Sequence, residues 1–324
     1  MNIDDLEKIN IRPSLLEKIY DSMNLLFKAL PVAKKYDPTN GFYLAFSGGK
    51  DSQALYHIAQ LAQVPFKAHM MLTSVDPHEV ILFIKRQYPD VVLHKPKDSI
   101  YNLAVKKKFL LPSRIIRWCC AELKEVGGAG TVCLTGIRKQ ESVKRSKRQE
   151  VEVSNRSFAG DFEAFEKWSY ETISKKLKNL NQDQFAQHKS SEVQCINGKD
   201  KIIVNPMLDW TERDVWEFLN KVVKVPHCEL YDQGWKRIGC ICCPMSNQKT
   251  KIAEMERWPH VKRNWIKAIK RIRQDKDIKN ILTLNDFGDG TEDEICESVF
   301  NWWISGKSYK VWYADEIQQL KLKL

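Results

Sequence analysis

The stretch SGGKDS at residues 47–52 directly follows the apolar run FYLAF at residues 42–46. This order predicts a buried strand, a glycine turn and a helix that begins at Asp51 or Ser52. Such a corner presents free backbone N–H groups and a helix N-terminus to phosphate. Glycine lets the backbone approach a ligand closely, and Lys50 adds a positive charge. The pattern therefore predicts a phosphate-binding loop, and its plain alternative is a structural strand–turn–helix corner.

Composition indicates a globular chain without a membrane partner. The sequence has 324 residues, 43% of them hydrophobic, which allows a substantial core and about two domains. No stretch approaches the roughly 20 apolar residues of a membrane span, and the polar start MNIDDLEKIN is unlike a signal peptide. We therefore expect a cytoplasmic protein. The net charge of +11 favours polyanionic partners such as nucleotides or nucleic acid, although a merely soluble basic enzyme could carry it too.

Strand-like and helix-like patterns alternate along the first part of the chain, after a helical segment at residues 1–40. Strands are expected at about residues 42–46, 66–72, 91–93, 131–135 and 201–204. Helices are expected at about residues 52–63, after Pro77, at 98–108 and at 113–126. This α/β alternation predicts a parallel sheet with helices on both faces, whose ligand lies beyond the carboxyl ends of the strands.

The second part of the chain has a different character. Residues 139–148 are basic, and the polar stretch after them is interpreted as an insertion or lid at about 150–198, with a helix at 161–178. Thr211 and Asp214 stand three apart, as in a capping box that begins a helix. We expect an N-terminal helical segment at 1–40, a nucleotide-binding domain at 41–245 and a mainly helical C-terminal subdomain at 246–324.

Apolar and basic residues share the helical pattern beyond residue 244. One face carries Trp258, Val261, Trp265, Ile269 and Ile272, and the other carries Lys262, Arg263, Lys267, Lys270 and Arg271. The basic face and the aromatic residues nearer the C-terminus could supply phosphate contacts and stacking for nucleic acid. In the alternative interpretation, those aromatic residues only pack within a helical subdomain and complete its core. They are Trp302, Trp303, Trp312 and Tyr313.

Four of the nine cysteines form two close pairs. Cys119 and Cys120 are adjacent, and Cys240 and Cys243 form a C-x-x-C pattern within GCICCP. A C-x-x-C turn offers two thiolates to a metal, and a reducing compartment disfavours disulfides. Three interpretations stay open: a four-iron–four-sulfur cluster whose thiolates each meet a different iron, a zinc site for which adjacent cysteines must splay, and thiols that pack as small hydrophobes.

Together, the SGGKDS loop, the adjacent cysteines and the G-C-x-x-C-P pattern resemble the phosphoadenosine phosphosulfate (PAPS) reductase family of the PP-loop ATP pyrophosphatases. They are similar especially to cluster-bearing adenylyl-sulfate reductases and to the ATP pyrophosphatase of DNA phosphorothioation systems. The resemblance covers about residues 40–245. It implies an adenine-nucleotide α-hydrolase-like parallel sheet, followed by a mainly helical C-terminal region.

The resemblance also implies the site residues. One four-iron–four-sulfur cluster is bound by Cys119, Cys120, Cys240 and Cys243, with Cys242 as an alternative ligand. ATP with Mg²⁺ lies over Ser47, Gly48, Gly49, Lys50, Asp51 and Ser52, and the nucleotide site is completed by Thr73, Gly136, Arg138 and Arg145. Lys50 and Arg138 are the expected catalytic residues, since they would stabilise phosphate charge. The alternative for the loop around Arg138 is a solvated basic loop.

The chain departs from the family in one respect. Sulfonucleotide reductases need a nucleophilic cysteine in a C-terminal Glu-Cys-Gly-Leu-His segment, whereas the last cysteine here is Cys296, whose acidic neighbours raise its pKa. We therefore expect an enzyme that cleaves ATP to AMP and pyrophosphate to adenylate an acceptor in sulfur transfer. Candidate partners are DNA or tRNA as acceptor and a cysteine desulfurase as sulfur donor. The alternatives are a sulfonucleotide (APS/PAPS) reductase that uses Cys228 or Cys242, and a non-catalytic nucleotide- or nucleic-acid-binding subunit.

Overall fold

The computed structural model of this chain divides into two compact units. It describes residues 3–107, 111–154, 158–178, 195–196, 199–275, 277 and 281–323. The first unit, here the sheet unit, comprises Met1–Met70, Glu79–His94 and Val126–Ile238. The second, here the cysteine unit, comprises Met71–His78, Lys95–Glu125 and Gly239–Leu324. Each unit is built from segments that lie far apart in the sequence.

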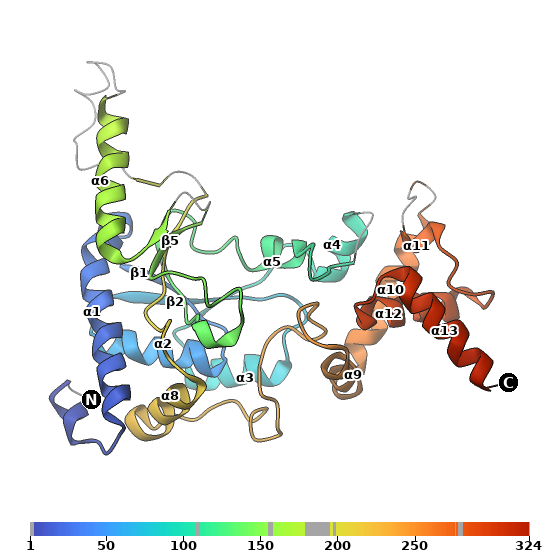
Figure 1. The fold of residues 1–324 in the computed structure, drawn as a ribbon, viewed down its shortest axis with the longest axis horizontal. Coiled ribbons are helices and arrows are strands. Elements are labelled where there is room, and N and C mark those ends of the chain that lie inside the picture. Colours follow the sequence, from blue (N-terminus) through green and yellow to red (C-terminus); the bar gives the residue numbers. More distant parts are fainter. Residues whose placement is uncertain are drawn as a thin grey trace. The chain divides into compact units, whose positions relative to one another are not determined.

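The sheet unit is built on a mostly parallel β-sheet (Figure 1). Within the described residues its strands are β1 (Phe42–Ala45), β2 (Phe66–Met71), β3 (Val92–His94), β4 (Val132–Leu134), β5 (Val151–Val153), β6 (Ala159–Gly160) and β7 (Ile202–Val204). They stand in the order β3-β2-β1-β4-β7-β5-β6. The strand β1 pairs in parallel with β2 and β4, and β4 pairs in parallel with β7. The α/β fold class predicted from the sequence is confirmed.

Two strands of this sheet are absent from the sequence prediction. The strand β5 pairs antiparallel with β7, with Val151 opposite Val204 and Val153 opposite Ile202, and β6 continues the sheet beside β5. Val151 and Val153 are buried on either side of Glu152. A three-residue strand is too short to display a clear alternation, so its pairing partner decides its structure. Residues 155–157, 179–194 and 197–198 of the expected insertion lie outside the described residues.

The sheet unit contains both α-helices and short helical turns. They are η1 (Ile3–Lys8), α1 (Pro13–Tyr36), α2 (Lys50–Leu61), α3 (His78–Gln87), η2 (Lys139–Glu141), α6 (Phe162–Lys178), α8 (Glu212–Glu217) and the π-helical turn η4 (Phe218–Val223). The long helix α1 buries Leu15, Ile19 and Leu26 and packs against α2 and β1. Burial of such a stripe supplies most of the stability of a helix in a protein.

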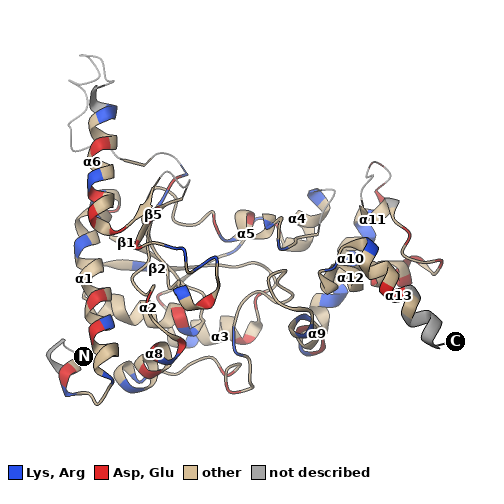
Figure 2. Ribbon diagram, in the orientation of Figure 1, with Lys and Arg blue, Asp and Glu red and all other residues tan. Residues whose placement is uncertain are grey.

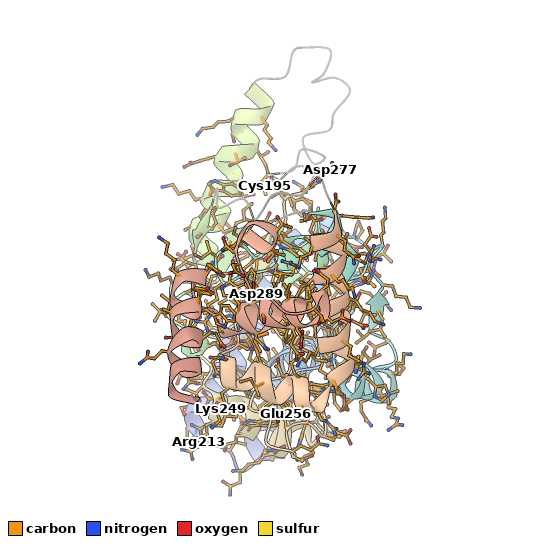
Figure 3. All side chains as sticks on the ribbon, turned by 90° about the vertical axis from the view of Figure 1, so that its right-hand side faces the viewer. Cys195, Arg213, Lys249, Glu256, Asp277 and Asp289 are labelled. Carbon is orange, nitrogen blue, oxygen red and sulfur yellow. The ribbon has the colours of Figure 1, made fainter. Side chains whose placement is uncertain are left out.

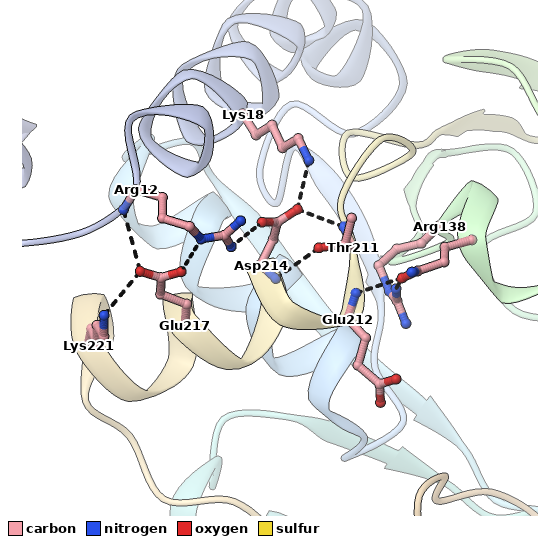
Figure 4. A network of polar contacts seen from close by, with 9 residues as sticks. Arg12, Lys18, Arg138, Thr211, Glu212, Asp214, Glu217 and Lys221 are labelled. Carbon is pink, nitrogen blue, oxygen red and sulfur yellow. Dashed lines mark hydrogen bonds and ion pairs between the residues drawn. The ribbon is translucent and has the colours of Figure 1, made fainter.

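The predicted capping box at the start of α8 is confirmed (Figure 4). The Thr211 hydroxyl accepts a hydrogen bond from the Asp214 N–H at 3.2 Å, and the Asp214 carboxylate accepts one from the Thr211 N–H at 2.8 Å. The same carboxylate is fully buried and binds Arg12 at 2.5 Å and Lys18 at 2.7 Å. One side chain therefore caps α8 and ties the N-terminal segment to it.

We expect Asp214→Asn to lower the free energy of unfolding by roughly 2–3 kcal/mol, because it leaves two cations without their buried partner. Burial by itself would raise the pKa of Asp214, but hydrogen bonds from Lys18, Thr211 and Arg12 lower it to about 2. A lowered folded-state pKa stabilises the fold fully above about pH 4, and this contribution is lost as the pH falls towards 2. Denaturant unfolding of wild type and variant should therefore differ at pH 7 and converge at low pH.

A matched control for this variant is Asp209→Asn. Asp209 also binds a lysine, Lys139, at 2.8 Å, but its side chain is 71% exposed. An exposed pair contributes little, so the change should cost less than about 1 kcal/mol. Equal losses in the two variants would contradict a special role for Asp214.

The described part of the cysteine unit is helical. Its helices are α4 (Ile100–Lys106), α5 (Trp118–Leu123), α9 (Gln248–Arg257), α10 (Pro259–Gln274), α11 (Ile281–Leu284), α12 (Glu292–Ser305) and α13 (Tyr309–Lys323). The apolar face predicted for residues 258–272 is buried, as expected. On α9, Lys249 and Glu256 lie on the exposed side (Figure 3), whereas Lys251 and Glu254 are buried.

Basic residues occur along α10 (Figure 2), and two of those on its basic face are paired within the unit. Acidic residues of α12 form the pairs Lys262–Glu297 and Lys270–Asp293. A third pair, Arg273–Glu292, involves the last turn of α10. Trp303 is buried, and its Nε1–H donates to the Pro112 carbonyl at 2.7 Å. These contacts favour the interpretation in which the C-terminal aromatic residues pack within the helical subdomain and complete its core.

No helix in the described ranges is both long enough and apolar enough to cross a membrane.

Candidate active site

The SGGKDS loop forms the predicted corner between β1 and α2. Helix α2 begins at Lys50, one residue earlier than the prediction, and Gly49 is its N-cap without a side-chain capping bond. The reason is that the Ser52 hydroxyl is used inside the loop, where it donates to the Gly49 carbonyl at 2.9 Å and accepts from the Ser47 N–H at 3.1 Å. These bonds hold the turn that presents the helix N-terminus.

Gly48 is required in this turn for two reasons. Its φ of +72° lies in the region that favours glycine. A Cβ atom here would also lie 2.8 Å from Val80 Cγ1 and 2.9 Å from Ile84 Cδ1, on helix α3. The sequence pattern indicates the need for glycine, but only packing against α3 shows how little space there is.

The loop borders a polar pocket of about 180 Å³ within the sheet unit. Side chains of both charges line it, together with backbone from three segments of the chain. The lining residues are Ala45, Ser47, Gly49, Lys50, Asp51, Ser52, Gly136, Ile137, Glu141, Arg145, Tyr231, Arg237 and Ile238. The structure therefore brings most of the predicted nucleotide-site residues together.

Lys50 is buried at the edge of this pocket, with two carboxylates near its ammonium group. Its Nζ lies 3.4 Å from Glu212 Oε1 and 3.6 Å from Asp51 Oδ2. It also stands 5.7 Å from the centre of the Tyr231 ring. A bound phosphate would compete with these carboxylates for the same charge.

The second predicted loop meets the first directly. Gly136 lines the pocket, and a Cβ atom on it would lie 2.8 Å from the Asp51 carbonyl oxygen. Arg138 is buried, and its Nε donates to Asp51 Oδ1 at 2.6 Å. It is not among the described residues that line the pocket, whereas Arg145 lines it and pairs with Glu141. Arg138 therefore holds Asp51 in place, and direct phosphate binding by Arg138 stays a prediction.

Tyr231 and Arg237 are pocket residues that sequence reasoning missed. The Tyr231 hydroxyl accepts a hydrogen bond from the Lys50 N–H at 2.9 Å, and its ring packs edge-on against Trp216. Burial raises the pKa of Tyr231, so its hydroxyl keeps its proton. Arg237 is exposed. The segment before GCICCP has no recognisable periodicity, and its position next to that motif is the only sequence signal.

Thr73 belongs to the cysteine unit rather than to the pocket lining. Its N–H and hydroxyl donate to the Asp76 carboxylate at 2.6 and 3.0 Å. Its hydroxyl oxygen also accepts from the Cys240 thiol at 3.3 Å. In this structure Thr73 therefore supports a cysteine, and its expected contact with the nucleotide stays a prediction.

Within the cysteine unit, the four cysteines predicted as ligands lie close enough to shift the pKa values of one another's thiols. A hydrogen bond with Cys120 is the main cause that raises the pKa of Cys119, and the nearby thiols of Cys240 and Cys243 raise it further. The partner thiol, Cys120, has its pKa lowered to about 5, first by Cys119 and then by Arg117. The tertiary structure thus brings together two pairs that are separated by more than a third of the sequence.

Cationic side chains accompany these thiols. Arg117 Nη2 donates to Cys120 Sγ at 3.1 Å. Lys124 is hydrogen-bonded to Cys240. The electrostatic interaction with this cysteine is the main cause that raises the pKa of Lys124. Arg117 Nε is buried and lacks a hydrogen-bond partner among the described residues. The surroundings therefore suit an anionic group that can accept further hydrogen bonds.

The described residues contain no group of three or more His, Cys, Asp or Glu side chains placed to hold one metal ion. A zinc site needs four ligands within about 2.3 Å of the metal. Binding of a four-iron–four-sulfur cluster, whose thiolates would each meet a different iron, stays a prediction.

Cys242, the proposed alternative ligand, lies buried between the two C-x-x-C thiols in sequence. Its φ is +59°, and its N–H donates to Glu254 Oε2 at 2.6 Å. Burial raises the pKa of its thiol. Glu254 therefore fixes the left-handed turn of the C-x-x-C segment through its backbone.

Two other cysteines behave as the sequence predicts. Cys133 is buried in β4, and burial raises its pKa to about 11. Cys296 is fully buried, and its pKa is raised to about 12 by burial first and by Glu292 second. The poor nucleophilicity expected of Cys296 thus follows mainly from its burial.

Residues 41–246 match the family model described as the phosphoadenosine phosphosulfate reductase domain. This chain belongs to that family. The matched range contains the SGGKDS loop, the second loop and both cysteine pairs. The PAPS reductase family predicted from the motifs is therefore confirmed.

Individual relatives of this PAPS reductase-family chain are distant. An uncharacterized protein of Methanocaldococcus jannaschii is 27% identical over 263 residues, which cover 77% of this chain and 54% of that protein. The chain thus spans about half the length of that relative. The adenosine 5'-phosphosulfate reductase of Shouchella clausii is 23% identical over 266 residues, covering 80% of this chain and 90% of that enzyme.

Solved structures resemble the chain only remotely. The PAPS reductase of Candida auris in a phosphate complex gives a TM-score of 0.41 at 17% identity, covering 68% of this chain and 87% of that one. The FMN adenylyltransferase of Candida glabrata, with FMN and an ATP analogue, gives 0.43 at 14% identity, covering 78% and 79%.

Proposed function

We propose that this chain binds ATP in the pocket of the sheet unit and cleaves it to AMP and pyrophosphate. The observation that carries the proposal is the SGGKDS corner, which places Lys50 and the N-terminus of α2 at the pocket. A nucleophilic oxygen of an acceptor attacks the α-phosphorus, the bond to the β-phosphate bridging oxygen breaks, and pyrophosphate leaves. The acceptor's proton passes to solvent, and the acceptor is left adenylated. Free AMP forms when water is the nucleophile, or when sulfur later displaces AMP from the adenylated acceptor.

The residues have distinct roles in this proposal. Backbone N–H groups of the loop and the Lys50 ammonium bind phosphate oxygens, and Arg145 adds charge from the second loop. Mg²⁺ would neutralise the β and γ oxygens. Arg138 acts through Asp51, since its guanidinium holds that carboxylate beside the helix start. Catalysis is then mainly positioning and stabilisation of charge.

A four-iron–four-sulfur cluster is the proposed cofactor of the cysteine unit. Cys119, Cys120, Cys240 and Cys243 would hold it, and Arg117 and Lys124 offer cationic partners for its negative charge. When bound, such a group would crosslink the start of α5 to the GCICCP segment. The proposal is supported by the mutual influence of the thiols and by the buried Arg117 Nε.

Nucleic acid is the proposed acceptor class, with sulfur replacing the activated oxygen in a later step. Support comes from the net charge of +11. DNA and tRNA are the candidates, and a cysteine desulfurase is the candidate source of sulfur.

A sulfonucleotide reductase is the second candidate function. It is favoured by the adenosine 5'-phosphosulfate reductase of Shouchella clausii, of which this chain covers 90%. Such an enzyme needs a reactive thiol, but Cys228 and Cys242 are both buried, and burial raises the pKa of each. We therefore place ATP cleavage first.

The deciding experiment uses protein purified without oxygen, with iron and sulfide assayed in the same sample. We expect AMP and pyrophosphate from ATP, with or without added DNA or tRNA. Sulfite release from a sulfonucleotide in the presence of a thiol reductant, without ATP cleavage, would establish the second candidate instead. ATP or nucleic-acid binding without any turnover would indicate a non-catalytic subunit and overturn both.

A further inference from the structure

The pocket is lined by three cationic side chains, and two of them already have carboxylate neighbours. Lys50 lies near Glu212 and Asp51, and Arg145 pairs with Glu141. Arg237 is the third. Within the described part of the chain, no ion pair is found for it, and its side chain is exposed. Its charge is therefore the one most readily available to an incoming anion.

The Tyr231 hydroxyl lies at a position where it could bind an oxygen of the incoming anion. Its hydroxyl accepts from the Lys50 N–H at 2.9 Å, at the first residue of helix α2. A Cβ atom on Gly49 would lie 3.5 Å from the same hydroxyl, so this oxygen lies directly over the loop. A phenolic hydroxyl that accepts one hydrogen bond can still donate its proton.

Both side chains come from one segment, residues 231–238, which is separate in sequence from both predicted nucleotide loops. The SGGKDS loop offers amide donors and the second loop offers Arg145. A third segment, with a phenol and a guanidinium that has no ion pair among the described residues, adds donors beyond those needed for one phosphate. Arginine binds phosphate oxygens through two parallel hydrogen bonds, which suits this task.

We propose that Tyr231 and Arg237 bind the polyphosphate of the nucleotide, and that Arg237 makes the pocket select a nucleoside triphosphate over a monophosphate. Arg237 also binds the released pyrophosphate. This inference rests on the proposed function, because it takes ATP as the substrate. It assigns a binding role to a segment that the sequence motifs leave without one.

The test measures binding of ATP, AMP and inorganic pyrophosphate, each with Mg²⁺, to the full chain by calorimetry. We expect Arg237→Gln to weaken ATP and pyrophosphate binding by roughly tenfold or more, because a charged hydrogen-bond donor is lost. AMP binding should change by less than about twofold. Arg237→Lys should recover part of the loss, since it keeps the charge but not the paired donors.

Matched variants separate this role from general charge and from packing. Lys236→Gln removes an equal charge from the exposed neighbouring residue, which does not line the pocket, and it should leave ATP binding unchanged. Tyr231→Phe keeps the ring against Trp216 and removes the hydroxyl, and it should weaken ATP binding about threefold or more. Unchanged melting temperatures will show that these variants fold.

The two proposals fail in different ways. Wild-type ATP binding and cleavage with an unaffected Arg237→Gln variant would overturn this inference alone. An equal loss of AMP and ATP affinity in Arg237→Gln would also overturn it, because selection by phosphate number requires a difference. Absence of ATP binding by the wild type would instead overturn the proposed function.

Discussion

Lys50→Ala is expected to reduce AMP and pyrophosphate release from ATP by roughly 10²–10³-fold, the usual cost of removing a group that stabilises charge in the transition state. The side chain is buried at the pocket, where water screens its charge poorly. Its removal also leaves Asp51 and Glu212 without the cation between them, so the pocket becomes more repulsive to phosphate. Steady-state assays should show the loss in both kcat and kcat/KM.

The control for this variant is Lys139→Ala. Lys139 belongs to the neighbouring basic loop, but it is 41% exposed and binds the exposed Asp209. We expect its removal to change the rate by less than about twofold, since an exposed pair contributes little. Retention of full activity by Lys50→Ala, or an equal loss in both variants, would contradict the proposed role of the loop.

Cys119→Ser is expected to remove the proposed iron–sulfur cluster from the protein. The iron content should fall from about four atoms per chain to less than one, with a parallel loss of acid-labile sulfide. Cys119 is the most informative position, because the three other predicted ligands all raise the pKa of its thiol. The thermal transition of the variant should also move downward, since a group that crosslinks two segments stabilises the fold.

Cys242→Ala decides between the two possible C-x-x-C ligands. Cys242 is buried, and alanine keeps a small apolar side chain there. We expect this variant to retain its iron and Cys243→Ser to lose it. The reverse result would assign ligation to Cys242, and zinc in place of iron in anaerobically prepared protein would contradict the cluster.

Local patterns in the sequence predicted most of the framework. The strand before SGGKDS, the capped start of α8 and the buried face of α10 each depend on residues within a few turns of one another. Such features follow from nearest-neighbour chemistry, which a sequence displays directly. The strand β5 was missed because it is short and is placed in the sheet by pairing with β7, about 50 residues later in the chain, and with β6.

The candidate site also combines features that local sequence predicts with features that only the tertiary structure reveals. Sequence alone determined the family, the strand–turn–helix corner at SGGKDS and the two cysteine pairs, because glycine, lysine and cysteine carry their chemistry at fixed spacing. Only the tertiary structure showed Arg138 bound to Asp51, Thr73 beside Cys240, and Tyr231 with Arg237 in the pocket. These contacts join residues 87, 167 and more than 180 positions apart in the chain. Folding sets such distances, and no local pattern of residues encodes them.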